Sequence, residues 1–122
     1  IFTYTRHAAK VNALAYSPDN KRIASADNDG RVHVWEPSEQ GFSYIYRGHF
    51  GEVVAIAWSP DSQRIASGGA DATVQLWDPI DGTHVFTYRE HTERITALAW
   101  SPNGQRIVSA SAGKTIHLWL AR

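Results

Sequence analysis

Three nearly continuous apolar segments of six residues divide the chain into equal parts. They read VNALAY at 11–16, VVAIAW at 53–58 and ITALAW at 95–100. Apolar character at almost every position is typical of a strand that is covered on both faces. Each segment is followed by Ser-Pro and then by Asp or Asn, which favour a tight β-turn. The pattern predicts three equivalent β-rich units.

Each unit continues with the signals of further short strands. A second strand is predicted at RIASA, RIASG and RIVSA, and a polar turn with Gly or Asp separates it from the next segment. That next segment alternates between polar and apolar residues, as RVHVW, TVQLW and TIHLW, and predicts a third strand. Aromatic and β-branched residues predict a fourth strand at 42–47 and 84–89, and residues 1–6 align with these two. No segment shows the periodicity of a helix.

The units repeat with a fixed spacing of 42 residues. The equivalent positions include His7, His49 and His91, Pro18, Pro60 and Pro102, and Trp35, Trp77 and Trp119. A fixed period of this size marks a repeat architecture, in which each unit buries its faces against its neighbours. Four short strands per unit predict an all-β propeller with three four-stranded antiparallel blades. We expect a single segment over 1–122, with repeats at about 7–48, 49–90 and 91–122, and with residues 1–6 as a closing fourth strand.

Composition and charge narrow the choice of partners. Twelve basic and twelve acidic residues give no net charge, which disfavours binding to nucleic acid or to an anionic membrane. No apolar run is long enough to span a bilayer, and the N-terminus lacks the pattern of a signal peptide. Cysteine is absent, which fits a cytoplasmic location. The first residue is not methionine, which suggests that the sequence is part of a longer protein.

The repeated residues resemble the WD-repeat β-propeller family over essentially the whole chain. The second repeat carries the family's pattern most completely, in Gly48-His49, Ser59-Pro60-Asp61, Ser67, Asp71 and Trp77-Asp78. The first repeat departs from it at Arg6 and Glu36, and the third at Glu90, Gly113 and Leu120. The uniformity of the copies indicates recent duplication or design.

The resemblance implies a structural hydrogen-bond network in each repeat. In it the Asp accepts from the His ring, the His contacts the Ser hydroxyl, and the Ser contacts the indole N–H. The matching residues are His7, Ser25, Asp29 and Trp35, then His49, Ser67, Asp71 and Trp77, then His91, Ser109 and Trp119. A hydrolytic triad of the same residue types is disfavoured, because the set recurs in all three units whereas catalysis normally uses one copy. We therefore expect no enzymatic activity and no cofactor.

The histidines do not predict a metal site. Six are present, but none has the spacing of zinc ligands. His33 and His117 share one repeat position, where the second unit has Gln75. This exchange favours a solvated strand position over a metal ligand.

Arginine recurs at one further repeat position, as Arg22, Arg64 and Arg106. We interpret these residues as surface side chains that pair with turn carboxylates such as Asp19 and Asp61. The alternative is an anion site at one mouth of the propeller channel.

The residue before each apolar segment differs between units. It is Lys10 in the first, Glu52 in the second and Arg94 in the third. In the WD-repeat family this rim of the top face is the usual surface for binding protein partners. Phe50 is the best single candidate, because a lone aromatic residue beside charges is typical of an interaction hot spot. Ordinary loop variability explains the same differences equally well.

Three blades are too few to close a ring. Copies should therefore join head-to-tail, with Phe2 and Tyr4 closing the blade of a neighbour. Two chains give six blades at about 60° each and three give nine at about 40° each, against about 51° in a seven-blade ring. The angle alone slightly favours six blades, but tighter packing of the inner strands disfavours the smaller ring, so we favour a trimer. The predicted function is a non-catalytic protein–protein interaction scaffold. The alternatives are an engineered or recently amplified unit without an evolved ligand and, less favoured, a ligand-binding or enzymatic propeller.

Overall fold

The computed structural model describes residues 1–38 and 40–122. Eleven strands and the turns between them make up these residues, and no helix occurs among them. Accordingly, the described residues include no helix that is long and apolar enough to cross a membrane.

The strands form three sheets, here called blades 1 to 3. Blade 1 consists of β1 (Val11–Tyr16), β2 (Ile23–Asp27), β3 (Val32–Trp35) and β4 (Ser43–Tyr46). Blade 2 consists of β5 (Val53–Trp58), β6 (Ile65–Gly69), β7 (Val74–Trp77) and β8 (Phe86–Tyr88). Blade 3 consists of β9 (Ile95–Trp100), β10 (Arg106–Ser111) and β11 (Ile116–Leu120). Within each blade the strands pair in sequence order, and all pairs are antiparallel.

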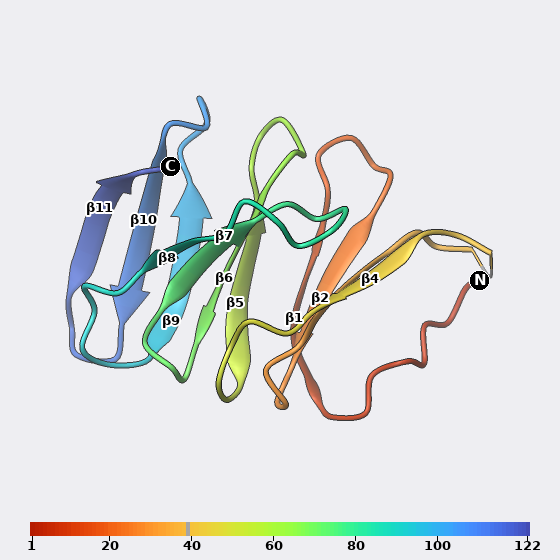
Figure 1. The fold of residues 1–122 in the computed structure, drawn as a ribbon, viewed down its shortest axis with the longest axis horizontal. Helices are drawn as coiled ribbons and strands as arrows, with labels where there is room; N and C mark the ends of the chain where they lie inside the picture. Colours follow the sequence, from red (N-terminus) through yellow and green to blue (C-terminus); the bar gives the residue numbers. More distant parts are fainter. Residues whose placement is uncertain (39) are drawn as a thin grey trace.

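The prediction of three four-stranded blades is correct for two of them. The expectation that residues 1–6 close the blade of a neighbouring copy stays a prediction. Blade 3 has three strands in the described part of the chain, and residues 1–6 belong to no sheet of this chain. The physical reason is that a strand needs a hydrogen-bonded partner edge. The edge with the matching repeat position is β11, and it lies at the other end of the molecule (Figure 1).

The core lies between the blades. One buried cluster joins blades 1 and 2 and contains Val32, Val34, Val53 and Trp77 among others. A second cluster joins blades 2 and 3 in the same way. A hydrogen bond accompanies each interface, because Trp58 and Trp100 donate their indole N–H groups to the carbonyl oxygens of Ala15 and Ala57, at 3.0 and 3.1 Å. Each blade is thus stabilised by the next one.

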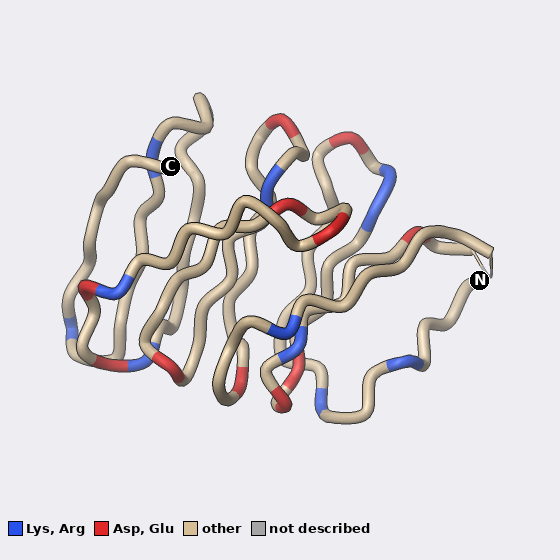
Figure 2. The backbone as a smooth tube through the Cα atoms, viewed as in Figure 1, with Lys and Arg blue, Asp and Glu red and all other residues tan. Residues whose placement is uncertain are grey.

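The three blades stand side by side in an arc (Figure 1). The N-terminal segment lies beyond blade 1 and β11 lies at the opposite end of the long axis (Figure 1). Most charged residues of both signs lie in the turns and connections at the edges of the sheets (Figure 2).

Candidate functional site

Blade 2 contains a complete relay of hydrogen bonds that joins two strands, the turn between them and the loop before β5. The indole N–H of Trp77 donates to Ser67 Oγ at 2.9 Å, and Ser67 lies 2.7 Å from His49 Nε2. The other ring nitrogen of His49, Nδ1, lies 2.9 Å from Asp71 Oδ2. Since the carboxylate only accepts, Nδ1 carries the proton and Nε2 accepts from the Ser67 hydroxyl. The relay satisfies polar groups that the fold has buried.

Asp71 is held as a carboxylate. Burial raises the pKa of its carboxyl, but hydrogen bonds from His49 and Thr73 outweigh that effect and lower the pKa to about 2. The oxygen that faces His49 also accepts the backbone N–H of Phe50 at 3.1 Å. The network therefore fixes the loop on which Phe50 stands.

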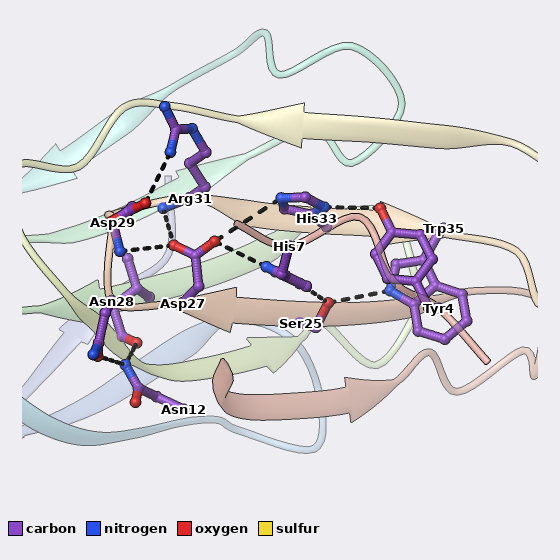
Figure 3. A network of polar contacts seen from close by, with 11 residues as sticks. Tyr4, His7, Asn12, Ser25, Asp27, Asn28, Asp29, Arg31, His33 and Trp35 are labelled. Atoms are coloured by element: carbon purple, nitrogen blue, oxygen red, sulfur yellow. Dashed lines mark hydrogen bonds and ion pairs between the residues drawn. The ribbon is translucent and has the colours of Figure 1, made fainter. Parts of the chain in front are cut away.

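Blade 1 makes the same hydrogen bond to histidine with a different residue. The carboxylate that accepts from His7 Nδ1, at 2.8 Å, belongs to Asp27 and not to Asp29 (Figure 3). The predicted role of Asp29 is wrong, because its side chain is directed toward Arg31, which lies 3.4 Å away (Figure 3). Asp27 is buried at the end of β2, where its second oxygen also accepts the backbone N–H groups of Asp29 and Arg31. Burial raises the pKa of Asp27, but these hydrogen bonds, with that from His7 first, lower it below its usual value.

His33 is not solvated, in contrast to the prediction. Its side chain is almost fully buried, and its ring stacks on His7 with the centroids 3.7 Å apart. Nδ1 lies 2.8 Å from the hydroxyl of Tyr4, whereas the buried Nε2 has no hydrogen-bond partner among the described residues. Burial, followed by the nearby charge of His7, lowers the pKa of His33 to about 4. The physical reason for the error is that this side of β3 is covered by residues 4 and 7.

The two histidines and Asp27 have the composition of a metal site, which the ligand spacing along the sequence did not reveal. One donor atom from each of the three residues lies within 4.8 Å of the others. A metal ion lies about 2.0–2.1 Å from an imidazole nitrogen, close to the plane of the ring. The stacked rings of His7 and His33 are tilted by only 26°, so their planes meet well beyond that bond length. We therefore interpret the cluster as a hydrogen-bond network.

Blade 3 contains only part of the network. Trp119 donates to Ser109 Oγ at 3.0 Å, and Ser109 lies 2.7 Å from His91 Nε2. Nδ1 of His91 is buried without a hydrogen-bond partner among the described residues, because Gly113 stands where blade 2 has Asp71. Burial, and then the neighbouring His117, lowers the pKa of His91. His117 stacks on His91 at 3.9 Å, as His33 stacks on His7.

A recurring tyrosine extends the network and was missed in the sequence. The hydroxyl groups of Tyr4 and Tyr88 contact His33 and His117, each at 2.8 Å. Tyr46 donates to Gln75 Oε1 at 2.5 Å, and burial raises the pKa of Tyr46 to about 12. The signal was present in the repeat alignment, where a tyrosine always accompanies His or Gln at a fixed spacing of 29 residues.

Residues 1–6 contact blade 1 in the way that the fourth strands contact the blades that follow them. The ring of Tyr4 stacks on Trp35 with centroids 4.3 Å apart, while Tyr46 on Trp77 and Tyr88 on Trp119 both stack at 4.2 Å. Phe2 also packs against Trp35, at 6.0 Å. Phe2 and Tyr4, predicted to close the ring, therefore contact blade 1 as the equivalent aromatic residues of β4 and β8 contact blades 2 and 3.

The recurring arginines do not form the predicted ion pairs. Arg22 lies over the ring of Phe42, with 4.9 Å to its centroid, and Arg64 donates to the carbonyl of Arg122. The ion pairs found within residues 1–38 and 40–122 do not link Arg22 to Asp19 or Arg64 to Asp61. The guanidinium of Arg22 packs instead on an aromatic ring, which binds a cation through its π face.

Three of the four rim residues are exposed, and Glu52 is half-buried. Phe50 is 86% exposed, on the loop before β5, and Lys10 is exposed before β1. Arg94 and Glu52 form an ion pair at 2.6 Å across the edge of blades 2 and 3. The predicted rim candidates therefore lie on one edge of the three sheets, at the start of the inner strands.

A protein-family model matches the chain along its whole repeat region, and individual proteins match part of it. The family described as "WD domain, G-beta repeat" matches three times, at residues 1–36, 41–78 and 82–119. Among curated proteins, mouse Striatin-4 is 44% identical over 39 residues, which cover 32% of this chain and 5% of that protein. Periodic tryptophan protein 2 homolog of Dictyostelium discoideum is 41% identical over 39 residues, which cover 32% and 4%. Periodic tryptophan protein 2 of Saccharomyces cerevisiae is 47% identical over 30 residues, which cover 25% and 3%.

The matched segments are therefore a small part of much longer relatives. The three family matches, in contrast, cover most of this chain, and each of the last two spans the fourth strand of one blade and the three strands of the next. The chain belongs to the WD-repeat family.

Proposed function

We propose that this chain is a non-catalytic protein–protein interaction scaffold that completes a propeller ring by joining copies head-to-tail. WD repeats indicate an interaction scaffold, and proteins of this family are generally non-catalytic. The finer proposal, that copies of this chain associate with one another, is supported by the two open ends of the arc.

The observation that carries the proposal is the exposure of the same repeat positions at the two ends. Val74 and Leu76 on blade 2 are 0% exposed, whereas the equivalent Ile116 and Leu118 on blade 3 are 72% and 67% exposed. At the other end, Tyr16 is 54% exposed where blade 2 has Trp58 at 8%. Contiguous exposed apolar surface of this kind marks an interaction site. The open face of blade 3 lies where a following blade would pack, and the open face of blade 1 lies where a preceding blade would pack. Blade 1 of a second copy therefore fits the first face, and blade 3 of a second copy fits the other.

Residues 1–6 supply the strand that blade 3 lacks. The register of β7 with β8 pairs Val74 with Tyr88 and Leu76 with Phe86. Shifting by one repeat, Ile116 of one copy pairs with Tyr4 of the next copy, and Leu118 pairs with Phe2. The groove beside β11 has a volume of about 430 Å³ and is lined by Phe86, Tyr88, Trp119 and other residues of blades 2 and 3. A neighbouring copy would thus add a strand to an open sheet edge, a known mode of recognition.

Angle and packing favour different numbers of copies in the ring, the angle slightly favouring two and packing three. Dimers give six blades and trimers give nine, and we favour the trimer because a narrower ring compresses the inner strands. The inner strands already make close contacts, as the indole hydrogen bonds of Trp58 and Trp100 to the preceding blade show.

A protein or peptide partner would bind the top rim. Phe50 projects from a loop that Asp71 fixes by a hydrogen bond, so its exposed ring is presented with little freedom. A rigid aromatic residue flanked by charges is favourable as an anchor for a partner. The charged neighbours at this rim are Lys10, Glu52 and Arg94.

The molar mass in solution tests the ring. Light scattering should give two or three times the mass of one chain. A variant lacking residues 1–6 should be monomeric, because each junction would lose two buried aromatic side chains, and burial of each contributes roughly 1.5–3 kcal/mol. Leu118→Lys should have the same effect through the partner edge. Ile80→Lys is the matched control, since Ile80 is exposed in the β7–β8 connection, away from both open faces.

Two results would overturn the proposal. A monomer at all concentrations would assign the open faces to blades of another polypeptide. An unchanged mass and melting temperature without residues 1–6 would show that the blades associate without strand exchange.

A further inference from the structure

We propose that the turn between β9 and β10 is a site of spontaneous covalent modification, at which Asn103 is converted to aspartate without an enzyme. The sequence contains four asparagines, and only Asn103 is followed by glycine. An asparagine side chain can react with the next backbone nitrogen, and a glycine at that place has no Cβ to hinder the approach. The reaction needs one chain only, and it is therefore independent of the propeller ring proposed above.

The reacting groups of this turn are accessible to water. Asn103 is exposed and Gly104 is half-buried. A Cβ built on Gly104 would lie 3.6 Å from Pro60 Cδ, which is an ordinary contact, so the space around the glycine is open. Asp61, at the equivalent position of blade 2, is exposed although blade 3 follows it. A further blade beside blade 3 would therefore leave Asn103 accessible.

Hydrogen bonds within the turn polarise the side-chain carbonyl of Asn103. Its Oδ1 accepts the hydroxyl of Ser101 at 2.7 Å and the backbone N–H of Gln105 at 3.0 Å. When the nitrogen of Gly104 attacks Cγ, negative charge develops on this oxygen, and donors that are already in place stabilise that charge. The hydrogen bond from Nδ2 to Gln105 Oε1 is long, at 3.5 Å, so the leaving group is only weakly held.

The backbone of this turn is free to move into the reactive geometry. The N–H of Gly104 donates to the carbonyl oxygen of Ser101 at 2.9 Å, and this bond must open before the nitrogen attacks. Gly104 has a φ of 74°, and without a side chain it rotates at little steric cost. The equivalent turns of blades 1 and 2 are tied together, because the N–H of Asp19 donates to Ser62 Oγ at 3.1 Å. Gly104 has no hydroxyl with which to tie the turn of blade 3 to that of blade 2 in this way.

The reaction proceeds through a cyclic imide. The backbone nitrogen of Gly104 loses its proton and forms a bond to Cγ of Asn103, while the bond from Cγ to Nδ2 breaks and ammonia leaves. Water then opens the five-membered ring. Cleavage between the Gly104 nitrogen and Cγ gives aspartate, and cleavage between that nitrogen and the backbone carbonyl carbon gives isoaspartate. One water is consumed and one ammonia is released, and no bond is oxidised or reduced.

The aspartate product fits the turn. Asp19 and Asp61 stand at the equivalent positions, and the Oδ1 atom of each accepts a serine hydroxyl at 2.6 Å and a backbone N–H at 3.0 Å. Conversion of Asn103 therefore gives blade 3 the carboxylate that the other two blades have, and lowers the net charge of the chain by one. Isoaspartate lengthens the main chain by one carbon and disrupts these hydrogen bonds.

The test follows the conversion of each asparagine in the folded chain by peptide mapping and mass spectrometry, at neutral and at mildly alkaline pH. Asn103 should react at least about tenfold faster than Asn20 and Asn28, which are also exposed but are followed by residues with side chains. The rate at Asn103 should rise with pH, because the nitrogen of Gly104 must lose its proton. Equal rates at the three asparagines would overturn the site.

Two variants separate the chemistry from the fold. Gly104→Ser should slow the conversion of Asn103 by about tenfold and should still fold, because Ser62 has a φ of 62° in the equivalent turn. An unchanged rate in this variant would overturn the role of the glycine, and the site with it. Asn103→Asp, which reproduces the product, should keep the melting midpoint of the original chain and release no ammonia from this turn. A clearly lower midpoint would show that the aspartate does not fit.

Discussion

Blades 2 and 3 share one sequence pattern and differ in what surrounds them. Blade 2 has four strands, neighbours on both sides, and a network in which His49 has partners at both ring nitrogens. Blade 3 has three strands, one exposed face, and a buried His91 nitrogen without a partner among the described residues. The same repeat pattern therefore gives a blade in both surroundings, and we expect the neighbours and single residues to set how stable each blade is.

The first test of this comparison replaces the same tryptophan in each blade. Trp77→Ala should lower the free energy of unfolding by about 3–5 kcal/mol, because Trp77 is fully buried and its indole joins the complete relay. Trp119→Ala should cost clearly less, since Trp119 is partly exposed and its relay ends at His91. Denaturant melts at one protein concentration measure both. Equal losses would mean that the incomplete network does not weaken blade 3.

The second test uses acid, and it compares His33 in blade 1 with Gln75 in blade 2. The pKa of His33 is about 4 in the folded protein, because its ring is buried, against about 6.5 in an unfolded chain. As the pH falls, the unfolded chain therefore binds a proton at this histidine before the folded protein does. His33 does not lower the free energy of unfolding above pH 6.5, but it lowers this free energy progressively as the pH falls toward 4. The loss should reach about 2–3 kcal/mol at pH 4.5.

His33→Gln, which reproduces the residue of blade 2, should remove most of this dependence of the free energy of unfolding on pH. The lowered pKa of His91 should leave a smaller slope in both proteins. Melts at pH 7.5 and 4.5 would refute the assignment if the variant lost as much stability as the original chain.

The third test distinguishes the two aspartates of blade 1. Asp27→Ala should cost about 2 kcal/mol, because it leaves His7 Nδ1 and two backbone N–H groups without their acceptor. Asp29→Ala should stay within about 0.5 kcal/mol, since its carboxylate is exposed. Thermal melts of the two variants provide the measurement, and the reverse order would restore the assignment made from repeat alignment.

That assignment shows where repeat alignment succeeds and where it fails. The spacing of 42 residues predicted the blades and the positions of Ser25, Ser67 and Ser109, because hydrogen-bonded registers recur with the period. It failed at Asp29 because a carboxylate two residues earlier reaches the same histidine. Blade 2 cannot use that earlier position, where a Cβ on Gly69 would lie 2.0 Å from the carbonyl oxygen of Glu52.

The burial of His33 was missed for a related reason. Alternation along β3 placed it on one face of the sheet, but the segment that covers this face, residues 1–7, comes from outside the blade. Side-chain contacts between segments that do not pair cannot be read from periodicity. The same limit applies to residues 1–6, whose aromatic residues were aligned correctly although the strand itself needs another edge.

The smallest expected effect comes from restoring the missing carboxylate of blade 3. Gly113→Asp would place an acceptor near His91 Nδ1, and Gly113 does not have the positive φ that would make a side chain strained there. A Cβ at this position would lie 2.6 Å from Glu93 Oε2, the end of a flexible side chain, so the new carboxylate would lie against the carboxylate of Glu93.

Because the two carboxylates would repel each other, we expect little gain in stability from Gly113→Asp alone. In a Glu93→Gln background, it should raise stability by about 1 kcal/mol, which is modest for a hydrogen bond to a charged group because the new side chain must also be ordered. Melts of Glu93→Gln with and without the Gly113→Asp change measure the contribution of the new carboxylate to stability. An unchanged midpoint would show that the stability of blade 3 is limited by its missing strand and not by its missing carboxylate.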